Sequence, residues 1–329
     1  MSVQQQNLSS TQEIYKKISK FVPEAEWKIH APLIEKINKI KKEKNAIILA
    51  HNYQTPEIYH GISDFSADSL ALAVEASKTK ADIIVMCGVH FMAETAKLMS
   101  PNKKVLLPDM TAGCSLSSSI TGEDVRKLKK MYPGVPVVSY VNTSADVKAE
   151  TDVCCTSANA VKIVNSLGVN KVIFLPDDYL AKYVASQTDV EIISWKGTCE
   201  VHEQFNDEEI NEIRKNNPGI KIIAHPECPP DVIKASDFAG STSGMIKYVK
   251  DNQPEKVMMV TECSMSDNVQ IDNPNVEFIR PCNLCPHMKR ITLPKILDCL
   301  ENETNELIMD HETIEKARKS VERMAEIGR

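Results

Sequence analysis

Hydrophobic and polar residues follow two alternating patterns along this chain. Short, nearly continuous apolar runs such as NAIILAHNY (45–53) and ADIIVMCG (81–88) are typical of buried strands. Between the runs, segments such as DSLALAVEASKTK (68–80) and HFMAETAKLMS (90–100) carry apolar residues at helical spacing. Strands that are apolar along their whole length need cover on both faces, so the alternation predicts parallel sheets flanked by helices.

The alternation occurs three times. Each set has three strand-like runs, at 45–53, 81–88 and 104–109, then 135–142, 170–177 and 190–195, then 219–228, 256–262 and 275–280. Helical patterns at 157–167, 178–187 and 242–252 separate strands of the later sets. A unit repeated every 86 residues or so indicates duplicated domains rather than a solenoid. We therefore predict an α/β protein in which three homologous three-layer domains, each with a small parallel sheet, surround a pseudo-threefold axis.

Two similar polar segments join the repeats. TGEDVRKLKKMYPG (121–134) and NDEEINEIRKNNPG (206–219) read as helices that stop at Pro-Gly. We place the domains at 1–120 (N-terminal helices plus first repeat), 121–205 (second repeat) and 206–329 (third repeat plus C-terminal helices). The segment before about residue 42 and the helix from Asp310 lie outside the repeat, and we expect them to pack across it.

The charge balance limits the class of partner. A formal net charge of −6 and a pI near 5.8 give no general attraction to nucleic acid or anionic membranes. The first fifteen residues carry no basic and apolar leader pattern, and no apolar run is long enough to span a membrane, so we expect a cytoplasmic protein. There, the ten cysteines should stay reduced, as metal or cluster ligands, buried thiols or redox sensors.

One cysteine follows the last strand-like run of each set. Cys114, Cys199 and Cys285 are separated by 199 − 114 = 85 and 285 − 199 = 86 residues. Ligands of α/β sheets bind beyond the carboxyl ends of the strands, where these cysteines lie. Three converging thiolates are one short of the usual set for a [4Fe–4S] cluster, which would leave one iron open as a Lewis acid.

Other interpretations of the cysteines remain open. Free cysteines are often buried as small hydrophobic residues. We expect this of the other seven, which are Cys87, Cys154, Cys155, Cys228, Cys263, Cys282 and Cys299. PCNLCPHM (281–288) could also hold zinc through Cys282, Cys285 and His287, although the sequence nearby supplies no second pair of ligands.

The first strand of each set ends in polar groups suited to proton transfer. These are His51 and Tyr53, then Tyr140 and Asn142, then His225 and Glu227. A single histidine at a strand end is more often structural, but three parallel occurrences favour a site. His202 follows Cys199 by three residues and should face a ligand there.

Hydroxyl groups precede several predicted helices. Ser69, Ser157 and Thr242 could bind a carboxylate or phosphate at a helix N-terminus, or be ordinary N-caps. No G-x-G-x-x-G or Walker loop occurs, so nucleotide binding is not indicated.

With these residues assembled, the chain closely resembles the quinolinate synthase family. The resemblance extends from about Pro32 to Leu300 and rests on LAHNYQTPEI, DFSADSLALA, PDMTAGCSL, YVNTSADVKAETDVCCTSANAV, WKGTCEVHEQF, HPECP, GSTSGM and CPHMKRITL, in this order. It implies three homologous domains around one [4Fe–4S] cluster held by Cys114, Cys199 and Cys285. It also implies condensation of iminoaspartate with dihydroxyacetone phosphate to quinolinate, phosphate and water, a step of de novo NAD biosynthesis.

The resemblance also assigns roles at matching positions. Tyr53 and His51 would handle proton transfers and carbonyl isomerisation, Glu227 would act as general base beside His225, and Tyr140 would lie against the open iron with Asn142. The groups that would bind carboxylates and phosphate are Ser69, Asn142, Ser157, His202, Ser241 and Thr242. An L-aspartate oxidase or dehydrogenase would supply the iminoaspartate, although no docking surface is evident in the sequence.

The chain departs from some family members near its last cluster ligand. Those members carry C-x-x-C-x-x-C before the proline, whereas this chain has only Cys282 and Cys285. We expect Cys282 not to be a ligand, although in air it could pair with Cys285. Two other classes remain as alternatives, an iron–sulfur sensor without enzymatic activity and an aconitase-like hydro-lyase.

Overall fold

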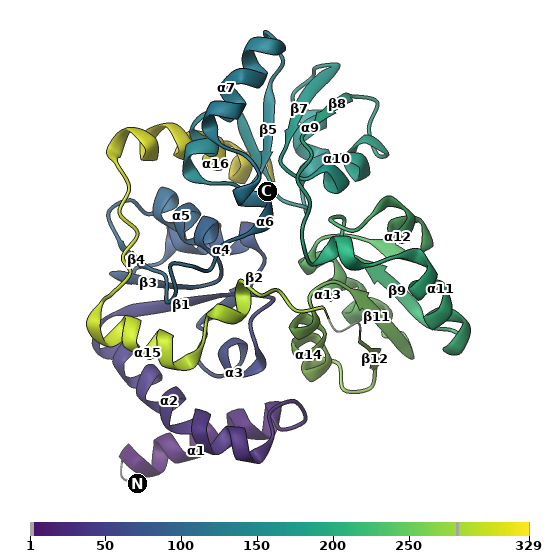
Figure 1. Cartoon of the computed structure of the whole chain (residues 1–329). Helices are drawn as coiled ribbons and strands as arrows, with labels where there is room; N and C mark the ends of the chain where they lie inside the picture. Colours follow the sequence, from purple (N-terminus) through teal and green to yellow (C-terminus); the bar gives the residue numbers. More distant parts are fainter. Residues whose placement is uncertain (1–2, 281–282, 329) are drawn as a thin grey trace.

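The computed structural model describes residues 3–280 and 283–328 and contains three four-stranded parallel sheets (Figure 1). The sheets comprise β1 (Ala46–His51), β2 (Phe65–Ala67), β3 (Ile83–Cys87) and β4 (Lys104–Leu106); β5 (Val137–Tyr140), β6 (Val153–Cys155), β7 (Lys171–Leu175) and β8 (Glu191–Ser194); and β9 (Lys221–Ala224), β10 (Phe238–Ala239), β11 (Lys256–Val260) and β12 (Glu277–Ile279). Their orders are β2-β1-β3-β4, β6-β5-β7-β8 and β10-β9-β11-β12. The predicted α/β class with repeated small parallel sheets is confirmed.

The expectation of three strands per sheet is wrong, because each sheet has an additional edge strand. β2, β6 and β10 are only two or three residues long, and each pairs with the first strand of its sheet. So short a segment shows no hydrophobic periodicity. In each sheet, the order places the first and third strands side by side at the centre, where the direction of chain winding reverses.

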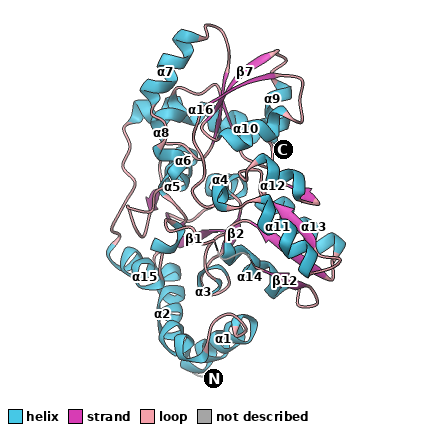
Figure 2. Ribbon diagram, turned by 45° about the vertical axis from the view of Figure 1, so that its right-hand side comes forward, coloured by secondary structure: helices cyan, strands magenta, loops and turns pink. Residues whose placement is uncertain are grey.

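Helices cover the sheets at equivalent places in each repeat (Figure 2). A helix follows each edge strand, namely α4 (Ser69–Lys78), α9 (Ala160–Ser166) and α13 (Thr242–Asn252). Another follows each third strand, namely α5 (His90–Met99), α10 (Asp178–Ala185) and α14 (Cys263–Asp272). A short helix follows each first strand, namely α3 (Pro56–Tyr59), α8 (Ala145–Ala149) and α12 (Pro230–Ala235).

The predicted joints are the helices α7 (Gly122–Met131) and α11 (Asp207–Asn216). The Thr121 side chain caps α7 by accepting from the Asp124 N–H, and Asn206 caps α11 in the same way. Gly134 and Gly219 follow with φ angles of 77° and 83°, a conformation that favours glycine. The chain therefore makes the same stop and turn at both joints.

The terminal helices connect the repeats. α2 (Glu24–Glu43), which follows α1 (Val3–Ile18), packs against α15 (Leu293–Asn302) beside the first sheet. α16 (His311–Gly328) packs against α8, β6 and α5, so the end of the chain returns to the first two repeats. The expectation that these helices pack across the repeats is confirmed, whereas the exact domain boundaries stay a prediction.

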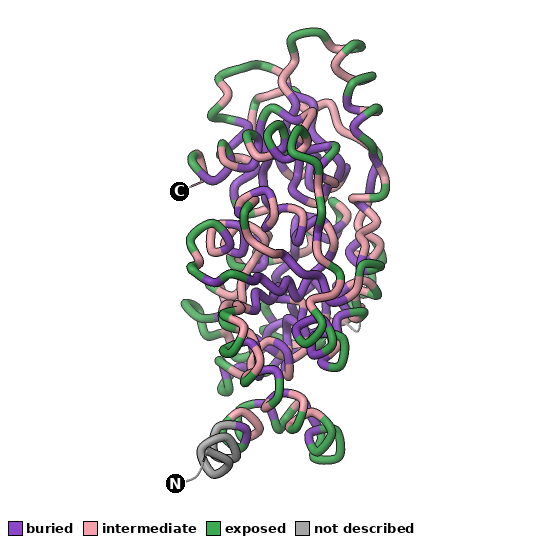
Figure 3. Tube along the Cα trace, turned by 90° about the vertical axis from the view of Figure 1, so that its left-hand side faces the viewer, coloured by how far each residue is buried: buried purple, intermediate pink, exposed green. Residues whose placement is uncertain are grey.

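The interior is divided unevenly between the sheets. One continuous hydrophobic core joins the first sheet to one face of the second sheet, and the other face of the second sheet has its own core. The two faces of the third sheet have separate cores. Figure 3 shows the buried stretches of the chain in purple. Among the described residues, no helix combines the length and apolar character that crossing a membrane requires.

Candidate functional site

The loops at the carboxyl ends of the three sheets surround one cavity of about 720 Å³, including its mouth. Thirteen of the fourteen residues singled out in the sequence line it, namely His51, Tyr53, Ser69, Cys114, Tyr140, Asn142, Ser157, Cys199, His202, His225, Glu227, Thr242 and Cys285. Ser241 is not among the lining residues.

The three periodic cysteines reach the cavity from three different sheets. Each begins a tight turn, at α6 (Ser115–Ser118), η1 (His202–Gln204) or η2 (Met288–Arg290). In each turn, the backbone N–H groups two and three residues further on act on the sulfur and lower its pKa. The donors are Leu116 and Ser117 for Cys114, Val201 and His202 for Cys199, and His287 and Met288 for Cys285.

These turns are suited to thiolates that bind metal. Burial raises the pKa of all three thiols, that of Cys114 to about 12, so without a cation the sulfurs stay protonated. A bound metal supplies the positive charge that burial removes, and the N–H groups stabilise the resulting anions. Three soft donors around one cavity therefore fit an iron–sulfur cluster. Cys282 lies outside the described residues.

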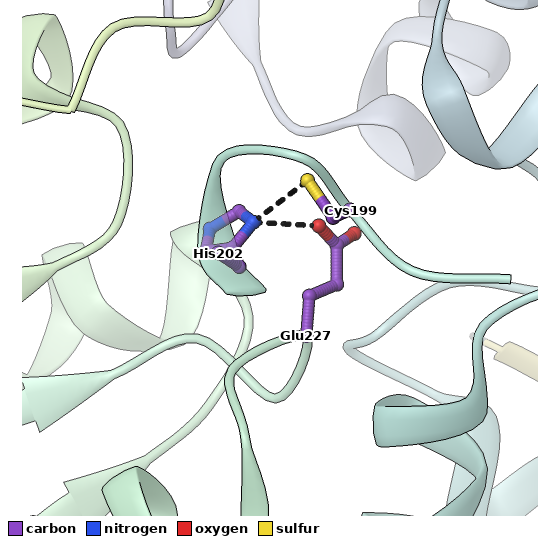
Figure 4. Close-up of side chains that lie close together, drawn as sticks. All are labelled: Cys199, His202 and Glu227. Atoms are coloured by element: carbon purple, nitrogen blue, oxygen red, sulfur yellow. Dashed lines mark hydrogen bonds and ion pairs between the residues drawn. The ribbon is translucent and has the colours of Figure 1, made fainter. Parts of the chain in front are cut away.

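Cys199, His202 and Glu227 form a second group of possible metal ligands (Figure 4). His202 Nδ1 lies 2.8 Å from Glu227 Oε2 and 3.1 Å from Cys199 Sγ, and the ligand atoms all lie within 4.8 Å of one another. Sulfur, nitrogen and oxygen donors of this kind suit zinc. Because Cys199 belongs to both sets, the two sets compete for one ligand.

The alternative of a zinc site at PCNLCPHM is tested only in part. His287 Nε2 lies 2.9 Å from Glu200 Oε1, and both residues line the cavity. Cys285 also faces the cavity, but the remaining ligand, Cys282, is outside the described residues. This interpretation therefore stays a prediction.

Glu227 is held as a carboxylate at the centre of the site. Burial alone would raise its pKa, but His225, His202 and the Tyr140 hydroxyl outweigh burial and lower it. Tyr140 donates to Glu227 Oε1 over 2.5 Å. Burial and the Glu227 charge raise the pKa of Tyr140 and of Tyr53, so both phenols remain proton donors.

Two buried histidines are neutral. Burial lowers the pKa of His51 to about 4 and that of His225 to about 3. Nδ1 of each ring accepts a backbone N–H two residues further on, from Tyr53 and Glu227 respectively. The ring proton therefore lies on Nε2, and in His225 it points to Ser157 Oγ at 3.1 Å.

The hydroxyl residues at helix N-termini divide into two kinds. Ser241 is the N-cap of α13 and accepts the Gly244 N–H over 3.1 Å, so its hydroxyl is committed to the helix. Thr242, the next residue, faces the cavity and accepts a hydrogen bond from the Asn52 amide over 2.9 Å. Ser69 likewise lines the cavity, while Asp68 caps α4.

The sequence interpretation missed the polar residues that follow the third strand of the last sheet. Thr261 Oγ1 lies 2.6 Å from the Tyr53 hydroxyl and 2.9 Å from His202 Nε2. Glu262 is fully buried and pairs with Lys289 over 2.9 Å. The sequence carries a signal for these residues, because VTE ends that strand with polar groups as AHPEC ends the first strand.

Lys289 connects two repeats beneath the site. Its Nζ donates to the Tyr53 carbonyl over 2.8 Å and to Ser264 Oγ over 2.7 Å. Glu262, its ion-pair partner, also lies 3.4 Å from the Cys285 N–H. One lysine thus fixes the turn that carries Tyr53 to the loop that carries Cys285.

Comparisons with known proteins agree on one family. The family model described as "Quinolinate synthetase A protein" matches residues 35–326. The chain is 59% identical to the quinolinate synthase of Sinorhizobium fredii over 317 residues, which cover 96% of this chain and 88% of the relative. It is 56% identical over 323 residues to the quinolinate synthase of Caulobacter vibrioides, covering 97% and 88%. The enzyme of Xylella fastidiosa is 59% identical over 294 residues, covering 89% and 87%.

Proposed function

The chain belongs to the quinolinate synthetase A family, and on that premise we propose that it condenses iminoaspartate with dihydroxyacetone phosphate to give quinolinate, phosphate and water. We also propose that Cys114, Cys199 and Cys285 hold a [4Fe–4S] cluster. The observation that supports both proposals is the opening of these three cysteines onto the cavity that contains Glu227 and its partners. When bound, such a cluster supplies an iron with an open position, a Lewis acid that polarises a carbonyl or hydroxyl oxygen.

The proton transfers are carried out by one ionised base and several protonated donors. Condensation and loss of water need a base and several acids within reach of one substrate. Glu227 is the ionised group and serves as the base, while Tyr140 donates to it. His51, which is buried at the end of β1, and Tyr53, which is half-buried two residues later, are donors placed to move protons during carbonyl isomerisation.

Substrate binding falls to the hydroxyl and amide groups around the cavity. Ser69 and Thr242 are the first residues of α4 and α13, where N–H groups favour phosphate and carboxylate, and Ser157 lies in the turn before α9. Asn142 and His202 complete this set on the second sheet side. Because Ser241 caps α13, it contributes to substrate binding indirectly, by fixing the position of Thr242.

The cellular setting is part of the same proposal. An L-aspartate oxidase or dehydrogenase supplies the iminoaspartate, and the reaction is a step of de novo NAD biosynthesis in the cytoplasm. What supports this is the name of the relatives and the requirement of the reaction for an imine.

The test is metal analysis and turnover of protein purified without oxygen. We expect about four irons and four sulfides per chain, lost in Cys114→Ser, Cys199→Ser and Cys285→Ser. Cys299→Ser is the matched control, since this buried thiol donates to the Thr304 carbonyl away from the cavity. Product should form only with both substrates.

Three results would contradict the proposal. Stoichiometric zinc bound through Cys199, His202 and Glu227 would replace the cluster. Dehydration of an acid without dihydroxyacetone phosphate would indicate a hydro-lyase. An intact cluster without any turnover would indicate a sensor.

A further inference from the structure

Lys148 is a fully buried lysine directly behind the cavity. Its side chain has no exposed surface. It belongs to α8, the short helix that follows β5. Its Nζ donates to the carbonyl oxygens of Val141, at 2.9 Å, and Thr143. The ring of Phe91, which lines the cavity, has its centre 5.6 Å from the same nitrogen.

This burial is costly, because no carboxylate compensates it directly. A buried ammonium normally needs a partner of opposite charge. Within the described residues, Lys148 forms no ion pair. Burial lowers its pKa, and Cys154, Glu94 and Cys114 oppose this only through longer-range attraction. The hydrogen bonds of the Lys148 side chain go to one backbone turn. The role of this lysine therefore depends on the residue that the turn carries.

The turn carries Asn142. The two carbonyl groups that Lys148 holds flank this residue on either side, and the Thr143 hydroxyl closes the turn by donating to the Tyr140 carbonyl over 3.0 Å. Asn142 lines the cavity, and its Oδ1 is buried without a hydrogen-bond partner among the described residues. A buried acceptor left unpaired is unfavourable, so this oxygen awaits a donor from a bound molecule.

We propose that Lys148 is a positioning residue for the substrate. Its Nζ holds the turn at 141–143 so that the Asn142 amide faces the ligand. The inference rests on the proposed function only for the choice of ligand, which is dihydroxyacetone phosphate.

Lys41 provides a matched control. It is also buried, with 7% of its surface exposed, and donates to the Ile62 carbonyl over 2.6 Å. Unlike Lys148, it pairs with Asp64 over 2.8 Å and does not line or flank the cavity. Replacing either lysine with methionine removes a buried amino group, but only the replacement of Lys148 frees the turn that carries Asn142.

The experiment is calorimetric titration of dihydroxyacetone phosphate into protein purified without oxygen, with equal iron content in all variants. We expect Lys148→Met to raise the Kd about tenfold, which corresponds to about 1.4 kcal/mol. Lys41→Met should lower the melting temperature and leave the Kd within about twofold. In an Asn142→Ala background, Lys148→Met should add little, because both changes disable one contact.

Several outcomes overturn the inference. The inference is rejected if Lys148→Met leaves the Kd unchanged or changes it no more than Lys41→Met does. It is also rejected if the effects of Lys148→Met and Asn142→Ala on the Kd simply add. If Lys148→Met does not fold, Lys148→Gln, which keeps N–H donors on a shorter side chain, undergoes the same comparison. Failure of the proposed function differs, because the parent protein would not bind dihydroxyacetone phosphate. In that case the same variants are titrated with inorganic phosphate and their Kd values are compared. If the protein binds no anion at all, the inference is also rejected.

Discussion

The Tyr140 hydroxyl lies 2.5 Å from Oε1 of Glu227, although one residue ends β5 and the other follows β9. This contact joins the second and third sheets at the floor of the cavity. The other oxygen of the same carboxylate contacts His202 at 2.8 Å. Each carboxylate oxygen thus has its own donor, and the base is fixed in orientation before substrate binds.

Replacing Glu227 with glutamine should remove the base and preserve the shape of the site. We expect kcat to fall by about 10²–10⁴, the usual contribution of a positioned general base, with a much smaller change in KM. Steady-state kinetics with both substrates measures the split. Glu212→Gln, an exposed change on α11, is the control and should retain full activity. A KM effect without loss of kcat would show that Glu227 binds substrate and does not transfer protons.

Ser241 and Thr242 are adjacent, but we expect replacement of Ser241 to lower stability and replacement of Thr242 to weaken substrate binding. Ser241→Ala removes the cap of α13 and should cost about 1 kcal/mol of stability while KM changes little. Thr242→Ala, in contrast, removes a hydroxyl that faces the cavity and should raise the KM for dihydroxyacetone phosphate. Thermal unfolding and steady-state kinetics on both variants separate the two roles. If Ser241→Ala raises KM more than Thr242→Ala, Ser241 contacts the substrate directly.

The buried histidines should make stability depend on pH. Because the pKa of His51 is about 4 in the folded chain and about 6.5 in an unfolded one, the unfolded state binds more protons between these values. Stability therefore falls as pH drops from about 6.5 to about 4, by up to about 3 kcal/mol for this residue. His225 acts in the same direction.

The matching measurement is the thermal unfolding midpoint of His51→Gln at neutral and at acidic pH. We expect the variant to lose less stability on acidification than the parent protein. His311→Gln, at the exposed start of α16, should follow the parent curve. Identical curves for all three proteins would contradict a neutral, buried His51.

The sequence predicts those parts of the fold that depend on local patterns. Apolar runs located the first, third and fourth strands of each sheet, and the spacing of Cys114, Cys199 and Cys285 indicated that they meet. The family resemblance is confirmed by the matched family model. These features are visible because each depends on residue type and separation along the chain.

Features that depend on contacts between repeats could not be predicted in this way. α14 was missed because it is buried around most of its surface, with polar residues such as Ser266 and Asn268 inside and no apolar stripe. Lys289 reads as an ordinary surface lysine until the fold brings Tyr53 and Glu262 to it. Partners that lie far away in the sequence leave no periodic signal.

We expect the buried Glu262–Lys289 ion pair to contribute more to stability than an ion pair with an exposed lysine. Glu262 is fully buried, and burial raises its pKa while Lys289 opposes the rise. Lys289→Met leaves this buried carboxylate without its cation, so we expect the free energy of unfolding to fall by about 3–5 kcal/mol. Lys295→Met breaks a contact of 2.6 Å with Asp109, in which the lysine is exposed, and should cost about 0–1 kcal/mol.

Thermal unfolding of both variants gives the comparison, and Glu262→Gln in the Lys289→Met background provides the decisive control. The neutral amide no longer requires a cation, so the double variant should recover part of the lost stability. Activity should not return with it, because the Tyr53 carbonyl has lost its only lysine donor among the described residues. Equal losses in Lys289→Met and Lys295→Met would instead mean that water reaches Glu262 and that the pair does not fix the Cys285 loop against Tyr53.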